Sequence, residues 1–208
     1  RLGPEDLRDP AARDPADASP LVAVAEHPGR SGATVVLVFT RGHRHSFARA
    51  TAALDQMGLS IQDARITPTA DAGSLDTYLV LEDTGLPITD GQRMAAIERN
   101  LARSLSERGA TAPAVTRRMP RQARMFTTAT QVSFSADPEN GRTILEVVAG
   151  DRPGLLSLIG KVLWDQRVDL HGAKIMTVGE RAEDVFTVTD ENSRPLDEAR
   201  CRSLAEAL

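Results

Sequence analysis

The stretch "GLSIQDARITPT" (Gly58–Thr69) can be laid over "RVDLHGAKIMTV" (Arg167–Val178) at an offset of 109 residues. After the next turn the offset becomes 108, where "DTYLV" (Asp76–Val80) meets "DVFTV" (Asp184–Val188). A match that continues through successive segments with one change of offset indicates an internal repeat. The chain therefore contains two copies of one unit, and we expect the fold to contain that unit twice.

Each copy shows the same succession of hydrophobic patterns. A β-branched run predicts a first strand, "TVVLVFT" in one copy and "TILEVVA" in the other. Apolar residues at helical spacing follow, and two alternating segments then predict two further strands. A last helix follows Thr89 or Asp90 in the first copy and Asp197 in the second, and these residues can cap it. The break in alternation at Asp63 and Gly172 predicts a bulge in each second strand.

The order of elements in each copy is βαββα, the ferredoxin-like order without its final strand. We expect an α+β fold in which two such units pack side by side in one body, rather than two independent beads. The fourth strand has more than one candidate source. "TATQVSFSA" (Thr128–Ala136) can complete the first unit, or it can form a hairpin with "RTILEVVA" (Arg142–Ala149), in which Gln131–Ser135 pairs with Ile144–Val148.

The repeat and the local composition together predict the domain organisation. Residues 1–32 are rich in Asp, Pro and Ala, so we expect a linker or tail, in which Leu21–His27 can add a short edge strand. Because the chain begins at Arg1, we expect it to be a piece of a longer protein. The remaining parts are a first unit at 33–105, a basic linker at 106–127, and a second unit with its preceding hairpin strand at 128–208.

Composition excludes several classes of protein. The net charge of −4 argues against a broad basic face for nucleic acid, and Phe39 and Tyr78 are too few aromatic side chains for single-strand stacking on a sheet. The single cysteine, Cys201, rules out an intrachain disulfide and is consistent with a cytoplasmic location. No apolar run approaches the roughly 20 residues that span a bilayer, so we expect no membrane segment.

Catalytic motifs are absent from the sequence. There is no Walker loop, no G-x-G-x-x-G opening a helix, and no histidine spaced for a nucleophilic triad. His43 and His45 with Asp55 form only a weak H-x-H pattern, with no cysteine or third histidine to complete a metal site. We therefore predict no catalytic residues and no metal site, and we expect the chain alone not to be an enzyme.

The loop within "GDRPGLLSLIG" (Gly150–Gly160) allows two interpretations. In the first, Asp151 caps the following helix and Pro153 lies in its first turn, where no N–H is needed. In the second, amides at the helix start bind a carboxylate, Gly154 lets a ligand approach, and Asp151 receives an ammonium group. The second interpretation requires a ligand with both a carboxylate and an ammonium group, as an α-amino acid has. On chemistry alone both interpretations stay open.

The segment "DRPGLLSLIGKVLWDQRVDLHGAKIMTVGERAEDVFTVTD" (Asp151–Asp190) resembles an ACT domain, a small-molecule regulatory module. "DARITPTADAGSLDTYLVLED" (Asp63–Asp83) and the arginine-rich linker with "MFTTATQVSF" (Met125–Phe134) resemble more specifically the tandem C-terminal ACT pair of bifunctional PII uridylyltransferase/uridylyl-removing enzymes. This resemblance covers about Leu21–Leu208.

The resemblance implies the function of a longer parent protein. Such enzymes attach UMP to PII nitrogen-regulatory proteins through a nucleotidyltransferase domain and remove it through an HD-type phosphohydrolase domain. Both reactions need Mg²⁺ or another divalent metal, and L-glutamine is the effector. Neither G-S-x-x-x-D-x-D nor a paired H-D motif is present here. The resemblance therefore implies a cytoplasmic sensor region without a cofactor, acting on the parent's catalytic domains.

The resemblance also implies a ligand site. From the loop motif it includes Asp151, Arg152, Pro153, Gly154, Leu155 and Leu156, and from a strand start it includes Val168, Asp169, Leu170 and His171. The first copy departs from this pattern, because "GHRHS" (Gly42–Ser46) lacks the acid. We expect its strand start, with Ser60 and Gln62, to form the far wall of a shared pocket instead.

Two alternatives stay open. An ACT pair can serve only for dimerisation or interaction, without a ligand, and a homo-oligomer is compatible with either function. The pair can also be the sensor of another amino-acid-controlled enzyme.

Overall fold

A computed structural model describes residues 19–26, 33–41, 45–69, 73–107, 129–152, 154–178 and 181–208. The elements of these residues repeat one order, in which two strands, a helix, two strands and a helix follow one another. In the first unit they are β1 (Leu21–Glu26), β2 (Thr34–Arg41), α1 (Ser46–Gln56), β3 (Leu59–Pro68), β4 (Gly73–Glu82) and α2 (Gly91–Ser106). In the second unit they are β5 (Gln131–Asp137), β6 (Arg142–Gly150), α3 (Leu155–Asp165), β7 (Val168–Val178), β8 (Arg181–Asp190) and α4 (Glu198–Ala207).

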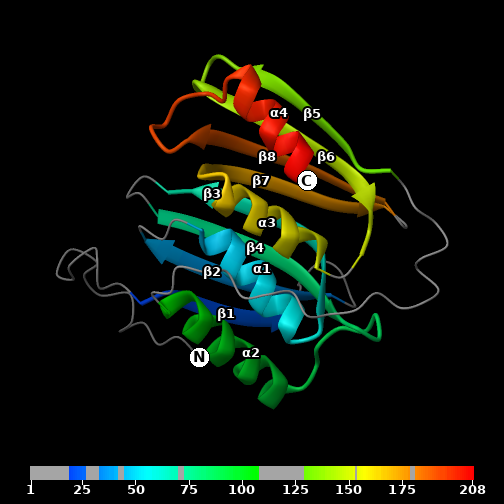
Figure 1. Cartoon of the computed structure of the whole chain (residues 1–208). Coiled ribbons are helices and arrows are strands. Elements are labelled where there is room, and N and C mark those ends of the chain that lie inside the picture. The colour runs from blue at the N-terminus through cyan, green and yellow to red at the C-terminus, as the bar shows by residue number, and fades with distance from the viewer. Residues whose placement is uncertain are drawn as a thin grey trace.

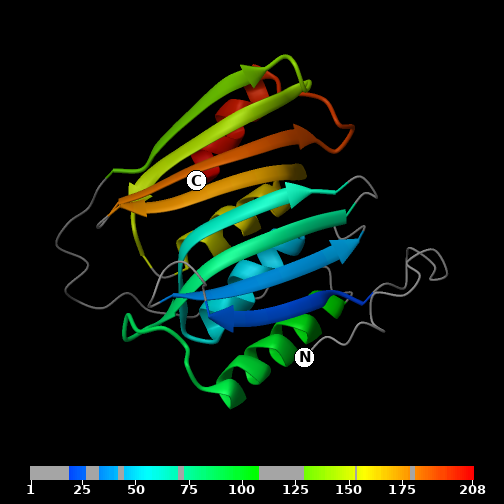
Figure 2. The same cartoon turned by 180° about the vertical axis from the view of Figure 1, so that it is seen from behind.

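The strands form one eight-stranded sheet in the order β1-β2-β4-β3-β7-β8-β6-β5, and every neighbouring pair is antiparallel. The two units meet where β3 pairs with β7, with Ala64 opposite Ile175 and Ile66 opposite Ala173. All four helices lie on one face of this sheet (Figure 1), and the opposite face carries none of them (Figure 2). The predicted α+β fold with two units side by side is confirmed.

Each unit takes its outer strand from the residues that precede it. β5 pairs with β6, with Gln131 opposite Val148 and Ser135 opposite Ile144, so the predicted hairpin is confirmed. The alternative in which Thr128–Ala136 completes the first unit is wrong. β1 pairs with β2 and occupies that edge. The short turn before Gly141, which has a φ of 62°, favours local pairing of β5 with β6.

The predicted bulges are present at equivalent positions in the two units. The pairing of β3 with β4 shifts between Ile61 and Asp63, and that of β7 with β8 shifts between Leu170 and Gly172. Gln62 in β3 is therefore an extra residue that the ladder skips, as is its counterpart in β7. Such bulges bend a strand and redirect its side chains, which places the start of each strand beside the helices.

One hydrophobic core continues through both units. The Phe47 ring on α1 packs edge-on against the Phe186 ring on β8, with centroids 5.9 Å apart and an angle of 71° between the rings. Because these rings belong to different units, the core joins the units rather than filling each one separately. No helix among the described residues is long and apolar enough to cross a membrane.

Helices α1 and α3 pack closely together at Gly160. A Cβ atom added to Gly160 would lie 2.8 Å from the Cα atom and 3.3 Å from the backbone nitrogen of Ala48. Real Cβ atoms almost never come so close to backbone, so only glycine permits this packing. The contact sets the spacing between α1 and α3, and the N-terminal ends of these helices border the cavities described below.

We predict that Gly160→Ala lowers the free energy of unfolding by about 1–3 kcal/mol because it overpacks this contact. The better helix propensity of alanine, worth about 1 kcal/mol, opposes only part of the loss. Urea unfolding measures the change. Gly91→Ala is the matched control, since nothing lies within 4 Å of a Cβ there. Equal midpoints for Gly160→Ala and the wild type would contradict the close packing.

Candidate functional site

The N-terminal ends of α1 and α3 have the same backbone conformation. The residue before each helix is left-handed, with a φ of 70° at His45 and 81° at Gly154, and neither helix has a side-chain cap. The interpretation that Asp151 caps α3 is therefore wrong. The helix begins at Leu155, three residues beyond the position that an aspartate cap at 151 would serve. Pro153 lies outside the described residues.

The first turn of α3 offers hydrogen-bond donors to a ligand. An α-helix leaves its first amides without a helical carbonyl. The Leu155 amide donates to the Arg152 carbonyl at 3.1 Å, and no side chain caps the helix. Among the described residues no acceptor is found for the amides of Leu156 and Ser157, and the helix macrodipole favours a negative charge beside them.

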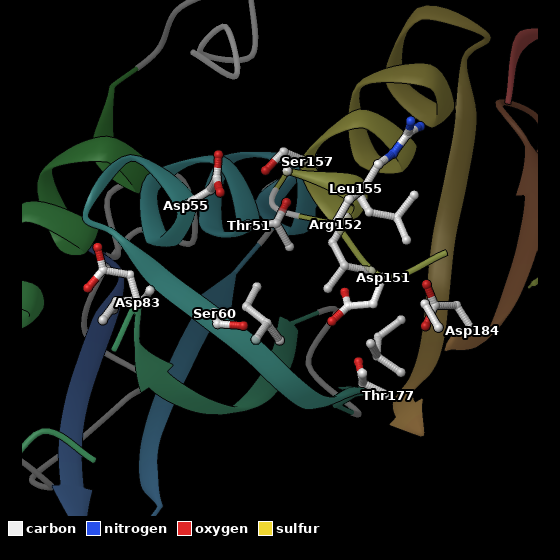
Figure 3. Close-up of a pocket in the computed structure, with 16 residues that line it drawn as sticks. Thr51, Asp55, Ser60, Asp83, Asp151, Arg152, Leu155, Ser157, Thr177 and Asp184 are labelled. Carbon is white, nitrogen blue, oxygen red and sulfur yellow. The ribbon is translucent and has the colours of Figure 1, made fainter. Parts of the chain in front are cut away.

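A cavity of about 220 Å³ lies between the two units in front of this helix end. Asp151, Arg152, Gly154, Leu155 and Leu156 line it from the second unit, and Ser60 lines it from the first, as Figure 3 shows for its labelled side chains. The other lining residues include Thr51 and Asp55 of α1 and Asp184 of β8. Pockets that bind drug-sized ligands have volumes of roughly 300–1,000 Å³, so this smaller cavity suits a ligand of amino-acid size.

A second cavity, of about 310 Å³, is the repeat-related counterpart of the first. It lies in front of α1 and is lined by His45, Ser46, Phe47 and Ala48 together with Val168, Asp169, Leu170 and His171. The sequence interpretation grouped Val168–His171 with the Asp151 loop, and the structure separates them. The reason is the pairing of β3 with β7, which sets each helix start against the strand of the other unit. Gly42, His43 and Arg44 lie outside the described residues.

Gln62 lines neither cavity. Its side-chain amide donates a hydrogen bond to the Ser60 Oγ atom at 2.8 Å. Gln62 therefore orients a residue of the first cavity from the bulge of β3 instead of facing a ligand there.

Carboxylic acids dominate the first cavity. Asp55, Asp83, Asp151 and Asp184 line it, and Arg152 is its only basic residue among the described parts of the chain. The Arg152 guanidinium extends away from Asp151 and Asp184 (Figure 3). Burial raises the pKa of Asp151, although a hydrogen bond from the Arg152 amide opposes the rise. The arrangement provides an acidic pole beside the amide pole of α3.

Asp184 is one of several residues of this cavity that sequence reasoning missed. Its side chain is 1% exposed, and burial raises its pKa to about 7, with the charge of Asp151 contributing to the rise. A signal was present in the sequence, because Ala182, Asp184 and Phe186 alternate on the inward face of one strand. An acid at an inward position between apolar residues marks either a buried network or a ligand site.

The histidines of the described residues take part in packing and hydrogen bonding. His45 stacks on Trp164 with ring centroids 4.0 Å apart, and the guanidinium carbon of Arg49 lies 5.4 Å from the centre of the Trp164 ring. His171 shares a 2.8 Å hydrogen bond with the Thr189 hydroxyl, and burial lowers its pKa. Within the described part of the chain no three histidine, cysteine or acidic side chains form a group suited to a metal ion.

Comparison with known proteins identifies similar sequences. No family model matches the chain. The bifunctional uridylyltransferase/uridylyl-removing enzyme of Pseudomonas savastanoi pv. phaseolicola is 39% identical over 204 residues, which cover 96% of this chain and 23% of that enzyme. The enzyme of the same name from Methylococcus capsulatus is 44% identical over 166 residues, which cover 80% of this chain and 19% of that enzyme.

The chain thus spans about 23% of the length of the first curated relatives that it matches. Among solved structures, the crystal structure of aspartate kinase from Synechocystis aligns with a TM-score of 0.47 at 11% identity, over 84% of this chain and 26% of that one. The sequence matches confirm the predicted resemblance. The chain is therefore a relative of one region of the bifunctional uridylyltransferase/uridylyl-removing enzymes.

Proposed function

We propose that this chain is the glutamine-sensing regulatory region of an enzyme that attaches UMP to PII proteins and removes it. One observation carries the proposal: the acid of Asp151 and the first-turn amides of α3 line the same cavity between the two units. An α-amino acid needs a partner for its ammonium group and another for its carboxylate, and this cavity offers both.

In this proposal the ligand carboxylate accepts hydrogen bonds from the amides of Leu156 and Ser157, and the ammonium group pairs with Asp151. Gly154, which has no side chain, allows the ligand to approach the backbone. Ser60, held by Gln62, contacts the ligand from the first unit. Each contact is made by a residue of the described cavity, and none requires a cofactor.

The position of the cavity supports a regulatory role. A ligand between the units contacts the α3 end of one and the β3 start of the other, so its binding energy depends on how the two units are arranged. Such a ligand favours one arrangement, and the catalytic domains of a parent enzyme can respond to it. The nucleotidyltransferase and hydrolase activities, their divalent metal, the PII substrate and the cytoplasmic location remain proposals about that parent.

The test is calorimetric titration of L-glutamine into the 208-residue chain. We expect a saturable heat for one site, and no heat for D-glutamine, which cannot place its ammonium and carboxylate groups on the same two partners. An interaction module without a ligand would give no heat with either compound, and would instead show a concentration-dependent mass by sedimentation. Such association would cover apolar side chains on the helix-free face, among them Leu37, Leu75 and Val185, which are 40%, 42% and 37% exposed.

A further inference from the structure

Asp184 is a buried acid whose carboxyl oxygens have no hydrogen-bond partner of normal geometry among the described residues. It lies on β8 between β6 and β7, its side chain is 1% exposed, and it lines the first cavity. Neither carboxyl oxygen accepts a hydrogen bond of normal geometry from any described residue. The Met176 amide lies near enough only to offset part of the rise in the pKa of Asp184.

The equivalent residue of the first unit is Asp76, and its surroundings differ. Asp76 is also fully buried, but it accepts hydrogen bonds from the Ser74 hydroxyl and, at 3.3 Å, from the Tyr78 hydroxyl. Proteins satisfy buried polar groups in nearly all cases, since an unsatisfied one is costly. Of the two repeat-related acids, Asp76 therefore accepts hydrogen bonds from neighbouring side chains, whereas Asp184 lines a cavity and its acceptor positions are not used by the described residues.

The charged side chains that line the cavity do not occupy the acceptor positions of the Asp184 carboxyl group, so a ligand with a hydrogen-bond donor can occupy them. Asp151 comes from the loop after β6, Asp55 from α1 and Asp83 from the end of β4, so three acids share the cavity with it. The Arg152 guanidinium extends away from it (Figure 3). The neighbouring strand β7 contributes the apolar Ile175 and the neutral Thr177.

We propose that Asp184 makes the cavity selective for glutamine over glutamate by accepting a hydrogen bond from the side-chain amide of the ligand. The proposal rests on the glutamine site proposed above, in which Asp151 holds the ammonium group and α3 holds the carboxylate. The side-chain NH₂ group of glutamine is a donor that fills a vacant acceptor. Glutamate would instead place a second carboxylate beside the carboxyl group of Asp184.

Binding of the ligand amide to Asp184 is coupled to the release of a proton from Asp184. Burial raises the pKa of Asp184 to about 7, so about nine-tenths of the side chain is protonated at pH 6. The ligand amide donates more strongly to the ionised carboxylate than to the acid. Binding therefore moves the Asp184 proton to solvent, and glutamine affinity weakens as the pH falls below 7.

The experiment compares Asp184→Asn with the matched control Asp76→Asn, which changes the equivalent acid outside the cavity. Calorimetry with L-glutamine and L-glutamate at pH 7.5 yields the ratio of the two dissociation constants. Asparagine can donate to a carboxylate, so Asp184→Asn should reduce the preference for glutamine at least about tenfold, the value of one charged hydrogen bond. Asp76→Asn should leave the ratio unchanged.

Proton release at pH 6, measured in two buffers of different ionisation enthalpy, is the second readout. The wild type should release a proton with glutamine that Asp184→Asn does not release. An unchanged preference in Asp184→Asn, or equal proton release in both proteins, overturns the role of Asp184 while the glutamine site stands. Absence of glutamine binding to the wild type overturns the site and this role together.

Discussion

Asp184→Asn should raise the free energy of unfolding at pH 8.5 by about 4 kcal/mol and leave it nearly unchanged at pH 4. Burial raises the pKa of Asp184 from 3.8 to about 7 in the folded chain. The folded state therefore holds a proton that the unfolded state releases, so the stability of the wild type falls as the pH rises from about 4 to 7. Each unit of pKa difference is worth 1.36 kcal/mol, and neutral asparagine avoids the whole loss.

Urea unfolding of both proteins between pH 4 and 8.5 measures this difference. The two stability curves should meet at acid pH and separate up to pH 7, after which the gap stays constant. Asp165→Asn is the control, because Asp165 is exposed and pairs with Lys161 at the surface, where such pairs contribute about 0–1 kcal/mol. Parallel curves for wild type and Asp184→Asn would show that the carboxyl is hydrated in the folded chain.

Asp151→Asn should weaken glutamine binding about 10- to 150-fold, because it removes the charge that pairs with the ligand ammonium group. A hydrogen bond between charged groups is worth about 1.5–3 kcal/mol, from which this range follows. The sequence alone suggested that Asp151→Ala would also remove a cap worth about 1 kcal/mol. Since α3 has no side-chain cap, neither substitution should lower Tm through the loss of a cap.

Calorimetry and thermal unfolding of the same preparations keep affinity and stability apart. Asp169→Asn is the matched control, since Asp169 is an acid of the second cavity. Its affinity for glutamine should equal that of the wild type, and so should that of Gly42→Ala in the first loop. Equal affinity in wild type and Asp151→Asn, with a loss in Asp169→Asn, would move the glutamine site to the second cavity.

The repeat, the order of its elements and the bulges could all be predicted, because each leaves a local trace along the chain. Alternation of apolar residues indicates a strand, helical spacing indicates a helix, and a break in step at Asp63 or Gly172 indicates an extra residue. The two units share these traces, which made the side-by-side arrangement recognisable. The resemblance to a known family added the loop at Asp151.

Contacts between distant residues left no such trace. Whether Asp151 caps α3 depends on the residue at which α3 begins. The same loop sequence is compatible with a capped and with an uncapped helix start, so the sequence could not decide between them. The assignment of Val168–His171 to a site depends on which helix start faces them. That is decided by four residues of β3 that pair with β7, more than 100 positions along the chain.

The sequence by itself therefore determined that two βαββα units are present and which loop carries an acid beside a helix start. Only the tertiary structure decided that each cavity combines the helix start of one unit with the strand of the other. It alone also showed that buried Asp184 finds no hydrogen-bond partner in the described part of the chain, whereas Asp76 at the same place in the repeat accepts hydrogen bonds from Ser74 and Tyr78. The physical reason is that periodicity reports which face of an element is buried, whereas hydrogen-bond partners and burial depth depend on residues that the fold brings together.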